Sequence, residues 1–415
     1  APEGAVASIT AADGTVTYYT SLFDKAEVSD EAGNVTSPAV PGAVSSLKTG
    51  ETLTLLQDET TTGLASKAKE AAAYFNFEGS AVFNMNGKTV TAETVNAQSY
   101  AFCVSAGSLT VQGGTLNVTK NGGGWKVDEG AELILTGSHH ASAMYATVDC
   151  YGAVKADAGV KVENYGNSNA IWLGGNKAEH MILDGVTVYS SGSQAAVAAT
   201  AGTADTVVSI TNCTVTSEKQ YAISLAGKSQ NVTLKGNTAI RKSGSGPAVN
   251  INGSVKAVID DLIAESASTF ALVVAGTSDV TINSGKYKAA YAALNVTGSG
   301  KVHYPEGKVM NNTPDGDGYF TLINEQDYVS KKVAQIGENI YESVDDAIKA
   351  VQDGETIKLV DDGYLLNSAT LGDKTVPASC TIDLNGHNLT LGATLSLYQT
   401  LTILDSTGAK SVLDF

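Results

Sequence analysis

Two adjacent carboxylates, Asp260 and Asp261, are the strongest candidates for acid–base chemistry in this sequence. Sugar-cleaving sites use one carboxyl group that donates a proton and a second that activates water or attacks the sugar. Arg241 and Lys242 precede the pair by one unit of the repeat described below and supply nearby cations. Adjacent residues of a strand face opposite sides, so both carboxylates face outward only at a corner of the chain. The alternative role for this pair is a solvated turn.

The other ionisable residues do not have the spacing of a metal site. Cys103, Cys150, Cys213 and Cys380 are widely scattered, so we expect isolated thiols. The five histidines share no metal-ligand spacing, and we expect the turn at residues 137–144, which contains two of them, to be exposed. Residues 315–318, DGDG, resemble the first half of a calcium loop, but the later ligands are missing, which favours a tight turn. The sequence therefore predicts neither a metal nor a cofactor.

A short pattern recurs between about residue 96 and residue 305: an alanine, an apolar residue, a variable residue and a second apolar residue. Neighbouring copies are separated by 22 to 26 residues, with first positions at 101, 124, 146, 170, 196, 222, 248, 271 and 293. A second short strand pattern, a turn rich in Gly, Asn and Asp, and often a third strand follow each copy. Repeats of this length form stacked solenoids, and the leucine framework of leucine-rich repeats is absent. The sequence thus predicts an all-β fold, a parallel β-helix with coils about 4.8 Å apart.

Strand alternation assigns the side chains of each repeat to two faces. The residue after the alanine should point inward and stack as a column of Phe102, Trp125, Ile171, Ile223, Val249, Leu272 and Leu294. The next residue should point outward, giving a column of Cys103, Lys126, Trp172, Ala198, Ser224, Asn250, Val273 and Asn295. The turn after the second strand should form a polar corner column of Asp184, Asn212, Asn237, Asp261 and Asn283.

Trp172 is the strongest candidate for ligand binding. In this register it projects from the sheet, and Ser224 and Asn250 lie farther along the same column, beyond Ala198. A flat aromatic side chain beside small polar groups offers a surface on which a sugar ring can stack. The alternative is that the turn at residues 137–144 covers the indole ring. We predict Trp172, Ser224 and Asn250 as a ligand-binding set.

The chain contains the beginning of a module twice. Ser343 and Asp346 match a capping box, residues 344–351 carry apolar residues at helical spacing, and Gly354 is suited to a C-cap. Residues 356–359 then alternate as a strand. Near the N-terminus, residues 19–26, 50–55 and 82–88 are similar to residues 341–347, 354–359 and 381–387. We expect each helix to cover the open end of a β-helix, where strand amides are unpaired.

These features resemble the right-handed parallel β-helices of the pectate-lyase-like superfamily, many of which begin with such a helix. The segments YESVDDAIKAVQDGETIKL and IDLNGHNLTL are similar to those of repeat-rich surface proteins of Gram-positive anaerobes. The resemblance implies a right-handed β-helix solenoid with short capping helices. We expect an N-terminal cap with the first coils at residues 1–95, the β-helix body at 96–305, a connecting segment at 306–332, and the start of a second, incomplete module at 333–415.

The resemblance specifies architecture better than activity. It implies a non-catalytic extracellular protein, secreted or attached to the cell surface, that serves as an adhesin-like or stalk module and binds glycans or cell-surface proteins. The alternative is a polysaccharide-degrading enzyme of the same fold, a glycosidase or lyase, with Asp260 and Asp261 as candidate catalytic residues. Lyases of the superfamily need calcium-binding acids and a basic residue. This sequence has one arginine and no evident acid cluster across neighbouring outward positions.

Composition excludes one class of partner. The formal net charge is −17, and Arg241 is the only arginine. Proteins that bind nucleic acids need clustered Lys and Arg, so we expect no nucleic-acid partner. No apolar run approaches the length of a membrane span, so we expect no membrane span in this chain.

Overall fold

The computed structural model describes residues 1–21, 28–29, 35–37, 43–64, 75–94, 99–175, 180–228, 231–244, 246–268, 270–365, 368–372, 379–398 and 400–414. The chain folds as two compact units, Ala1–Gln326 (unit 1) and Asp327–Phe415 (unit 2). Each unit has a hydrophobic core of its own. The two units are therefore described separately.

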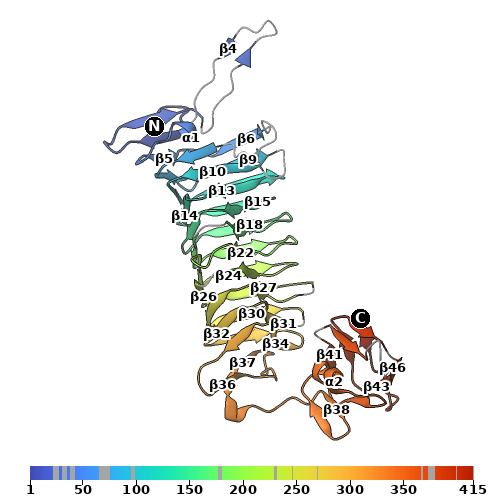
Figure 1. Cartoon of the computed structure of the whole chain (residues 1–415). Helices are drawn as coiled ribbons and strands as arrows, with labels where there is room; N and C mark the ends of the chain where they lie inside the picture. The colour runs from blue at the N-terminus through green and yellow to red at the C-terminus, as the bar shows by residue number, and fades with distance from the viewer. Residues whose placement is uncertain are drawn as a thin grey trace. The chain divides into compact units, whose positions relative to one another are not determined.

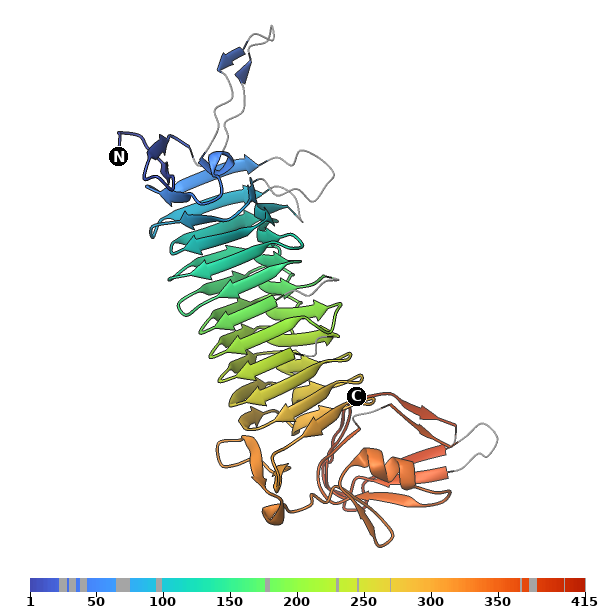
Figure 2. The same cartoon turned by 60° about the vertical axis from the view of Figure 1, so that its left-hand side comes forward.

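Unit 1 is a right-handed parallel β-helix, as the repeat predicts (Figure 1). The chain passes through three sheets in turn, and each passage forms one coil that stacks on the coil before it (Figure 2). In the described part of the chain, sheet I has 10 strands, sheet II has 13 and sheet III has 12.

The strands of the three sheets follow one another along the chain in the order I, II, III. Sheet I consists of β7 (Phe75–Glu78), β10 (Tyr100–Ala106), β13 (Gly123–Val127), β16 (Val148–Cys150), β19 (Ile171–Leu173), β22 (Val197–Ala201), β25 (Ile223–Gly227), β28 (Val249–Ile251), β31 (Phe270–Val274) and β34 (Ala292–Val296). Sheet II consists of β2 (Val16–Tyr19), β1 (Ala7–Thr10), β5 (Thr52–Leu55), β8 (Ala81–Asn84), β11 (Ser108–Gln112), β14 (Glu132–Thr136), β17 (Ala153–Ala156), β20 (His180–Asp184), β23 (Val207–Thr211), β26 (Asn231–Lys235), β29 (Lys256–Asp260), β32 (Asp279–Ile282) and β35 (Lys301–His303). Sheet III consists of β6 (Glu59–Leu64), β9 (Thr89–Thr94), β12 (Thr115–Lys120), β15 (His140–Ala143), β18 (Lys161–Asn164), β21 (Thr187–Ser190), β24 (Thr214–Ser217), β27 (Thr238–Arg241), β30 (Leu262–Ser266), β33 (Gly285–Lys288), β37 (Phe320–Asn324) and β36 (Lys308–Met310).

The predicted inward column of sheet I is confirmed. Cross-strand partners place the apolar residues in register from coil to coil, in the order Phe102, Trp125, Val148, Ile171, Val197, Ile223, Val249, Leu272, Leu294. All of them are buried except Leu294, which is partly buried in the last coil of the sheet. The rings of Phe102 and Trp125 stack with centroids 4.7 Å apart. Full burial of such a side chain contributes about 1.5–3 kcal/mol, so the column is a principal source of stability.

The corner between sheets II and III is polar, and the predicted corner column is confirmed in part. Asn212 has a left-handed backbone (φ 53°), and its side chain donates to Asp184 Oδ1 at 3.1 Å in the coil before it. Asp261 is also left-handed, with φ 52°. Asn237 is instead buried: its amide donates to the carbonyl of Ile210 at 2.6 Å. Short polar side chains thus tie successive coils together at this corner.

Antiparallel hairpins pair with the edges at both ends of unit 1. At one end β1 runs antiparallel to both β5 and β2, and at the other β37 runs antiparallel to both β33 and β36. The predicted connecting segment, residues 306–332, contains β36 and β37, which extend sheet III. Alternation alone does not show that a strand reverses direction, so the sequence did not indicate these hairpins.

The helices of unit 1 differ from the expected capping helix. The helix predicted at residues 19–26 lies largely outside the described residues. A shorter helix, α1 (Ala43–Ser46), contributes Ala43 and Val44 to the core. The short strands β3 (Val28–Ser29) and β4 (Val35–Ser37) pair as a separate antiparallel ribbon.

Unit 2 combines one helix with further parallel strand pairs. Its strands are β38 (Ala334–Ile336), β39 (Asn339–Tyr341), β40 (Thr356–Leu359), β43 (Ser379–Asp383), β46 (Thr400–Leu404), β41 (Gly363–Leu365), β44 (Leu389–Leu391), β47 (Leu413–Asp414), β42 (Ala369–Leu371) and β45 (Leu395–Leu397). A 3-10 helix, η1 (Glu325–Asp327), precedes them. The predicted helix is present as α2 (Val344–Ala350), with Ser343 as N-cap: the Asp346 amide donates to Ser343 Oγ at 3.1 Å. Gly354 is left-handed (φ 79°), but it lies in a turn after the helix and not at the C-cap, which is Val351.

The two module starts share hydrogen bonds as well as sequence. Asn86 and Asn385 are both left-handed, and each donates from its side chain to the carbonyl of the strand one coil earlier, Leu55 at 3.3 Å and Leu359 at 2.8 Å. In the same way Gly50 and Gly354 donate backbone amides to a serine carbonyl, at 2.7 and 2.6 Å. The internal similarity predicted from the sequence is thus a repeated structural motif.

Candidate functional site

The outer face of sheet I carries the predicted ligand-binding residues. Strand register confirms one outward column, here named the first outer file: Cys103, Lys126, Asp149, Trp172, Ala198, Ser224, Asn250, Val273 and Asn295. Two residues farther along each coil lies the second outer file: Ser105, Asp128, Tyr151, Gly174, Thr200, Ala226, Asn252, Ala275 and Thr297. Together the two files form one surface, in which neighbouring coils are about 4.8 Å apart along the axis of the β-helix.

Trp172 lies flat against this face because its neighbour in the second outer file is a glycine. A Cβ atom on Gly174 would lie 2.0 Å from Cη2 of the indole ring, so a larger residue would displace the ring. The rings of Tyr151 and Trp172 are nearly perpendicular, at 76°, with centroids 5.1 Å apart, a favourable aromatic geometry. Trp172 is half-buried and Tyr151 is exposed. Trp172 and Tyr151 thus form an aromatic surface, in which Gly174 and the contact between the two rings set the position of the indole ring.

The three predicted ligand-binding residues, Trp172, Ser224 and Asn250, lie in one file of the sheet. This alignment does not by itself test whether they bind a ligand. Trp172 pairs with Ala198, which pairs with Ser224, which pairs with Asn250. Ala198 is buried, whereas Ser224 and Asn250 are half-buried. Residues 137–144, the turn that was the alternative cover for Trp172, contain strand β15 of sheet III. The aromatic residue that contacts Trp172 is Tyr151.

On the other side of Trp172 the outer files carry charged and ionisable groups. Lys126 Nζ lies 2.6 Å from Asp128 Oδ1, and Cys103 Sγ donates to the other oxygen of Asp128 at 3.4 Å. Asp149 is buried and accepts a hydrogen bond from the Tyr100 hydroxyl. Burial raises the pKa of Asp149, although Tyr100 and Lys126 oppose the shift. Burial, with the charge of Asp128, raises the pKa of Cys103 to about 12, so this thiol is not a nucleophile near neutral pH.

Asp149 and Tyr151 are absent from the predicted outward column because the copy of the repeat predicted to start at residue 146 starts one residue later. Strand pairing places Thr147, not Ala146, beside Gly124, since Val148 is the partner of Trp125. The spacing contained a signal for this: an anchor at 147 lies 23 residues from both 124 and 170. With this register, two acids lie on adjacent coils of the outer face, Asp149 in the first outer file and Asp128 in the second.

The predicted catalytic pair, Asp260 and Asp261, lies elsewhere. Asp260 ends β29, and its Oδ1 accepts from Ser284 Oγ at 2.8 Å, while Asp261 occupies the left-handed corner position. Arg241 pairs with Ser266 on sheet III, five residues after Asp261, or about 16 Å along an extended strand. Arg241 is also buried, and its Nη2 donates to the carbonyl of Lys219 at 2.9 Å. Asp260 and Asp261 thus lie where β29 ends and the corner begins, and the structure does not bring them close to Arg241.

The two adjacent histidines differ from the expectation that both are exposed. His139 is fully buried, and its Nδ1 donates to the carbonyl of Gly113 at 3.0 Å. Burial lowers the pKa of His139 to about 4, so the ring is neutral near pH 7. His140 lies on β15, with Nε2 2.7 Å from Glu163 Oε2. His139 immediately precedes β15 and is buried, whereas His140, the first residue of this strand, is half-buried, and the predicted turn is in part a strand.

The remaining chemical candidates are structural within the described part of the chain. Asp315 closes a tight turn, as predicted, since its Oδ1 accepts from the amides of Asp317 at 3.0 Å and Tyr319 at 2.9 Å. Among the described residues, His, Cys, Asp and Glu form no group of three suited to a metal ion. No helix in the described ranges is long and apolar enough to cross a membrane.

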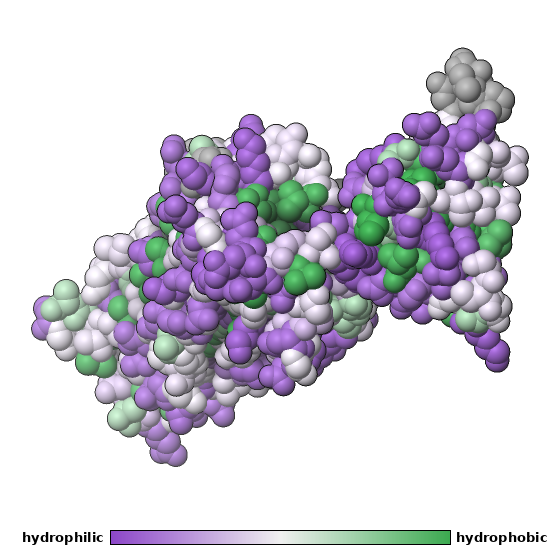
Figure 3. Space-filling view, turned by 90° about the horizontal axis from the view of Figure 1, so that it is seen from below, coloured by the Kyte–Doolittle hydropathy of each residue, from purple (hydrophilic) through white to green (hydrophobic). Residues whose placement is uncertain are grey.

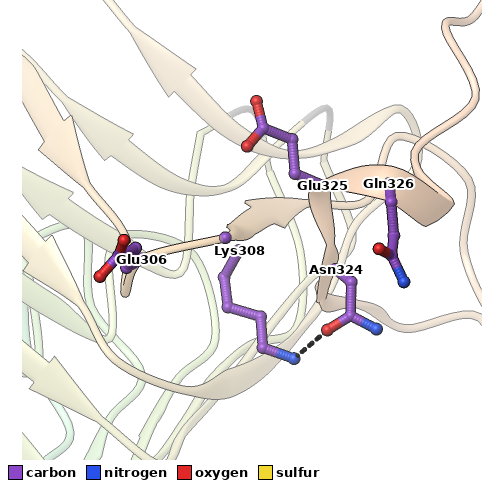
Figure 4. A pocket seen from close by; sticks show the side chains of 6 residues that line it. Glu306, Lys308, Asn324, Glu325 and Gln326 are labelled. Atoms are coloured by element: carbon purple, nitrogen blue, oxygen red, sulfur yellow. Dashed lines mark hydrogen bonds between the residues drawn. The ribbon is translucent and has the colours of Figure 1, made fainter.

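A pocket of about 620 Å³ lies beside the hairpin β36–β37 of unit 1 (Figure 4). Glu306, Lys308, Asn324, Glu325 and Gln326 point around it, and Lys308 Nζ donates to Asn324 Oδ1 at 2.8 Å. The lining has no aromatic residue. This pocket offers a polar surface without the features of a binding site for a sugar ring.

The surface seen in Figure 3 is mainly hydrophilic, and its hydrophobic residues form small separate patches. Three exposed large side chains precede Trp172 in the chain: Met144 follows β15 of sheet III, Tyr151 follows β16 of sheet I and Tyr165 follows β18 of sheet III, and they are 39%, 37% and 49% exposed. Of these, Tyr151 contacts the Trp172 ring. The aromatic surface on sheet I is therefore the best candidate binding surface among the described residues.

Comparison with known proteins supports the fold. A family model described as a right-handed beta helix region matches residues 155–326. No curated protein and no solved structure shows a significant match to the chain. The matched residues include Trp172, Ser224 and Asn250, but the family description concerns architecture only.

Proposed function

We propose that this protein is a non-catalytic, adhesin-like β-helix that binds glycans on the outer face of sheet I. The observation that carries the proposal is Trp172, whose indole ring lies over Gly174 and contacts the nearly perpendicular ring of Tyr151. An indole face of this kind packs against the apolar C–H face of a sugar ring. Ser224 and Asn250 follow in the same file and can exchange hydrogen bonds with sugar hydroxyls.

The proposed location is extracellular, secreted or attached to the cell surface, where glycans and neighbouring-cell proteins are presented. The sequence resemblance to repeat-rich surface proteins of Gram-positive anaerobes supports this location. The acidic composition also supports it, because a net charge of −17 keeps a repeat protein soluble and limits non-specific association. The stacked coils provide a rigid support that holds the binding face in register.

The test is affinity electrophoresis of the full chain against a panel of soluble polysaccharides. Wild-type protein should be retarded by at least one polysaccharide, and Trp172→Ala should weaken that binding about tenfold or more. Tyr18→Ala is the matched control, because Tyr18 is an exposed aromatic residue, 44% accessible, on β2 at the end of sheet II. It should bind like the wild type.

Tryptophan fluorescence gives an independent measurement. The chain has two tryptophans, and Trp125 is fully buried, so a ligand should change only the emission of Trp172. Gly174→Val should displace the indole ring and reduce binding without removing an aromatic group. Equal binding by Trp172→Ala and the wild type would show that the site is wrong, and retardation by no polysaccharide would reject the function.

A second candidate function, glycoside hydrolysis, is favoured by one observation. Asp128 is paired with Lys126 near the surface, whereas Asp149 is buried with a raised pKa on the next coil. Two carboxyl groups in such different environments are suited to base and acid roles. New reducing ends from a bound polysaccharide, lost in both Asp128→Asn and Asp149→Asn, would favour hydrolysis over simple binding.

A further inference from the structure

In the two outer files, the described residues of the three coils that follow Trp172 carry no charged side chain. In the first outer file Ser224 and Asn250 follow Trp172, and in the second Thr200, Ala226 and Asn252 follow Gly174. We name these six residues, Trp172, Thr200, Ser224, Ala226, Asn250 and Asn252, the neutral strip. Three coils span about 14 Å, enough for a short oligosaccharide lying along the β-helix axis.

Three cations among the described residues are already engaged. Lys126 lies 2.6 Å from Asp128, and Asp149 is a further acid beside it. Lys228, at the corner beyond Ala226, makes an interaction within the protein. Arg241, the only arginine, is buried and donates to backbone carbonyls. An anionic ligand on the strip would therefore gain no new ion pair from these three cations.

The charge of the whole chain adds to this local effect. At a net charge of −17 the protein repels polyanions, over a distance of about 8 Å at physiological ionic strength. A carboxylate or sulfate placed on the strip would also lose water without a compensating cation. Uncharged hydroxyl and amide groups carry no such cost, and Ser, Thr and Asn side chains match them as donors and acceptors.

We infer that the ligand of this face is a neutral glycan, composed of uncharged or N-acetylated sugars, and that polyuronates and sulfated or sialylated glycans are rejected. The inference rests on the proposed glycan-binding function and specifies its ligand class. Selectivity then comes from the absence of a cation and not from a dedicated repulsive residue.

The experiment uses affinity electrophoresis of the full chain with neutral probes, namely a mixed-linkage glucan, a galactomannan and a xylan, and acidic probes, namely polygalacturonate and hyaluronan. We expect retardation by at least one neutral probe, equal at 20 and 300 mM salt, and none by the acidic probes at either salt concentration. Retardation by an acidic probe alone, abolished in Trp172→Ala, would overturn the inference and leave the proposed function standing. Retardation by no probe would reject both.

A charge introduced into the strip provides the sharper comparison. Asn252→Lys should gain binding to polygalacturonate that disappears at 300 mM salt, because the new cation supplies the missing partner. Thr297→Lys is the matched control: it adds the same charge to the same file two coils away, outside the strip. It should not gain this binding. Equal gains in both variants, or a gain in neither, would contradict the neutral strip as the determinant.

Discussion

At the scale of single residues, a glycine and a histidine have environments that neither residue type indicates alone. Gly174 matters because the Trp172 ring occupies the space where its side chain would be. His139 matters because it is fully buried immediately before strand β15. In both cases the neighbouring residues, on the same coil for Gly174 and on the coil before for His139, set the environment.

The burial of His139 predicts a pH-dependent stability. Its pKa is about 4 in the folded protein and about 6.5 in an unfolded chain, so between these values only the unfolded state binds the proton. The free energy of unfolding should therefore fall as the pH drops from about 6.5 to about 4, by roughly 3 kcal/mol from this residue. Urea unfolding of wild type and His139→Gln at pH 7.5 and 4.5 measures the effect.

The variant isolates His139 from other groups that lose stability in acid, such as the carboxyls of Glu132 and Glu163, whose pKa values lie below the ordinary value. Burial acts to raise both pKa values, but hydrogen bonds with lysine outweigh it. The loss of stability on acidification should be smaller in His139→Gln than in the wild type. Identical losses would show that His139 is protonated in the folded state or accessible to solvent.

At the scale of elements, the corners of the coils limit which side chains fit. Gly107 follows β10, has φ 71°, and an added Cβ would lie 2.3 Å from the carbonyl carbon of Gly79 in the coil before it. Gly130 has a similar φ of 81° but no atom within 4 Å of an added Cβ. A side chain at Gly130 would meet only the cost of the left-handed backbone, whereas a side chain at Gly107 would also clash with the neighbouring coil. Comparing the two positions therefore separates these two costs.

Alanine at these two positions should therefore have unequal effects. Gly130→Ala should cost about 1–2 kcal/mol, the penalty of a left-handed backbone. Gly107→Ala should cost about 3 kcal/mol or more, because a backbone clash is added to the same penalty. Both losses of stability can be measured from the midpoint of urea unfolding, provided that the dependence of the unfolding free energy on urea concentration is the same in each variant. Similar values for the two variants would mean that the coils move apart readily and that corner contacts contribute little.

At the scale of the whole molecule, the chain has two cores and should unfold in two steps. Unit 1 holds Ala1–Gln326 and unit 2 holds Asp327–Phe415, so the calorimetric transitions should differ in enthalpy roughly as their lengths. Ser343→Ala removes the N-cap of α2 and should destabilise unit 2 by about 1 kcal/mol. Only the smaller transition should shift, and Ser343→Asp should largely restore it. A single transition that shifts as a whole would contradict independent units.

The sequence by itself was enough to predict the parallel β-helix, the inward column beginning at Phe102, the outward position of Trp172 and the duplicated module start. These features depend on local periodicity: a two-residue alternation within strands and a spacing of 22 to 26 residues between coils. The N-cap at Ser343 was predictable for the same reason, because a helix N-terminus is defined within four residues.

Only the tertiary structure decided the rest. The antiparallel hairpins at the ends of unit 1, the burial of His139 and the separation of Asp261 from Arg241 all depend on which strands become neighbours. Asp149 lies on the outer face of sheet I because the register of its strand differs by one residue from the predicted register, and such a change moves every side chain of a strand to the opposite face. Periodicity fixes the coils, whereas register and pairing direction are set by packing between segments far apart in the chain.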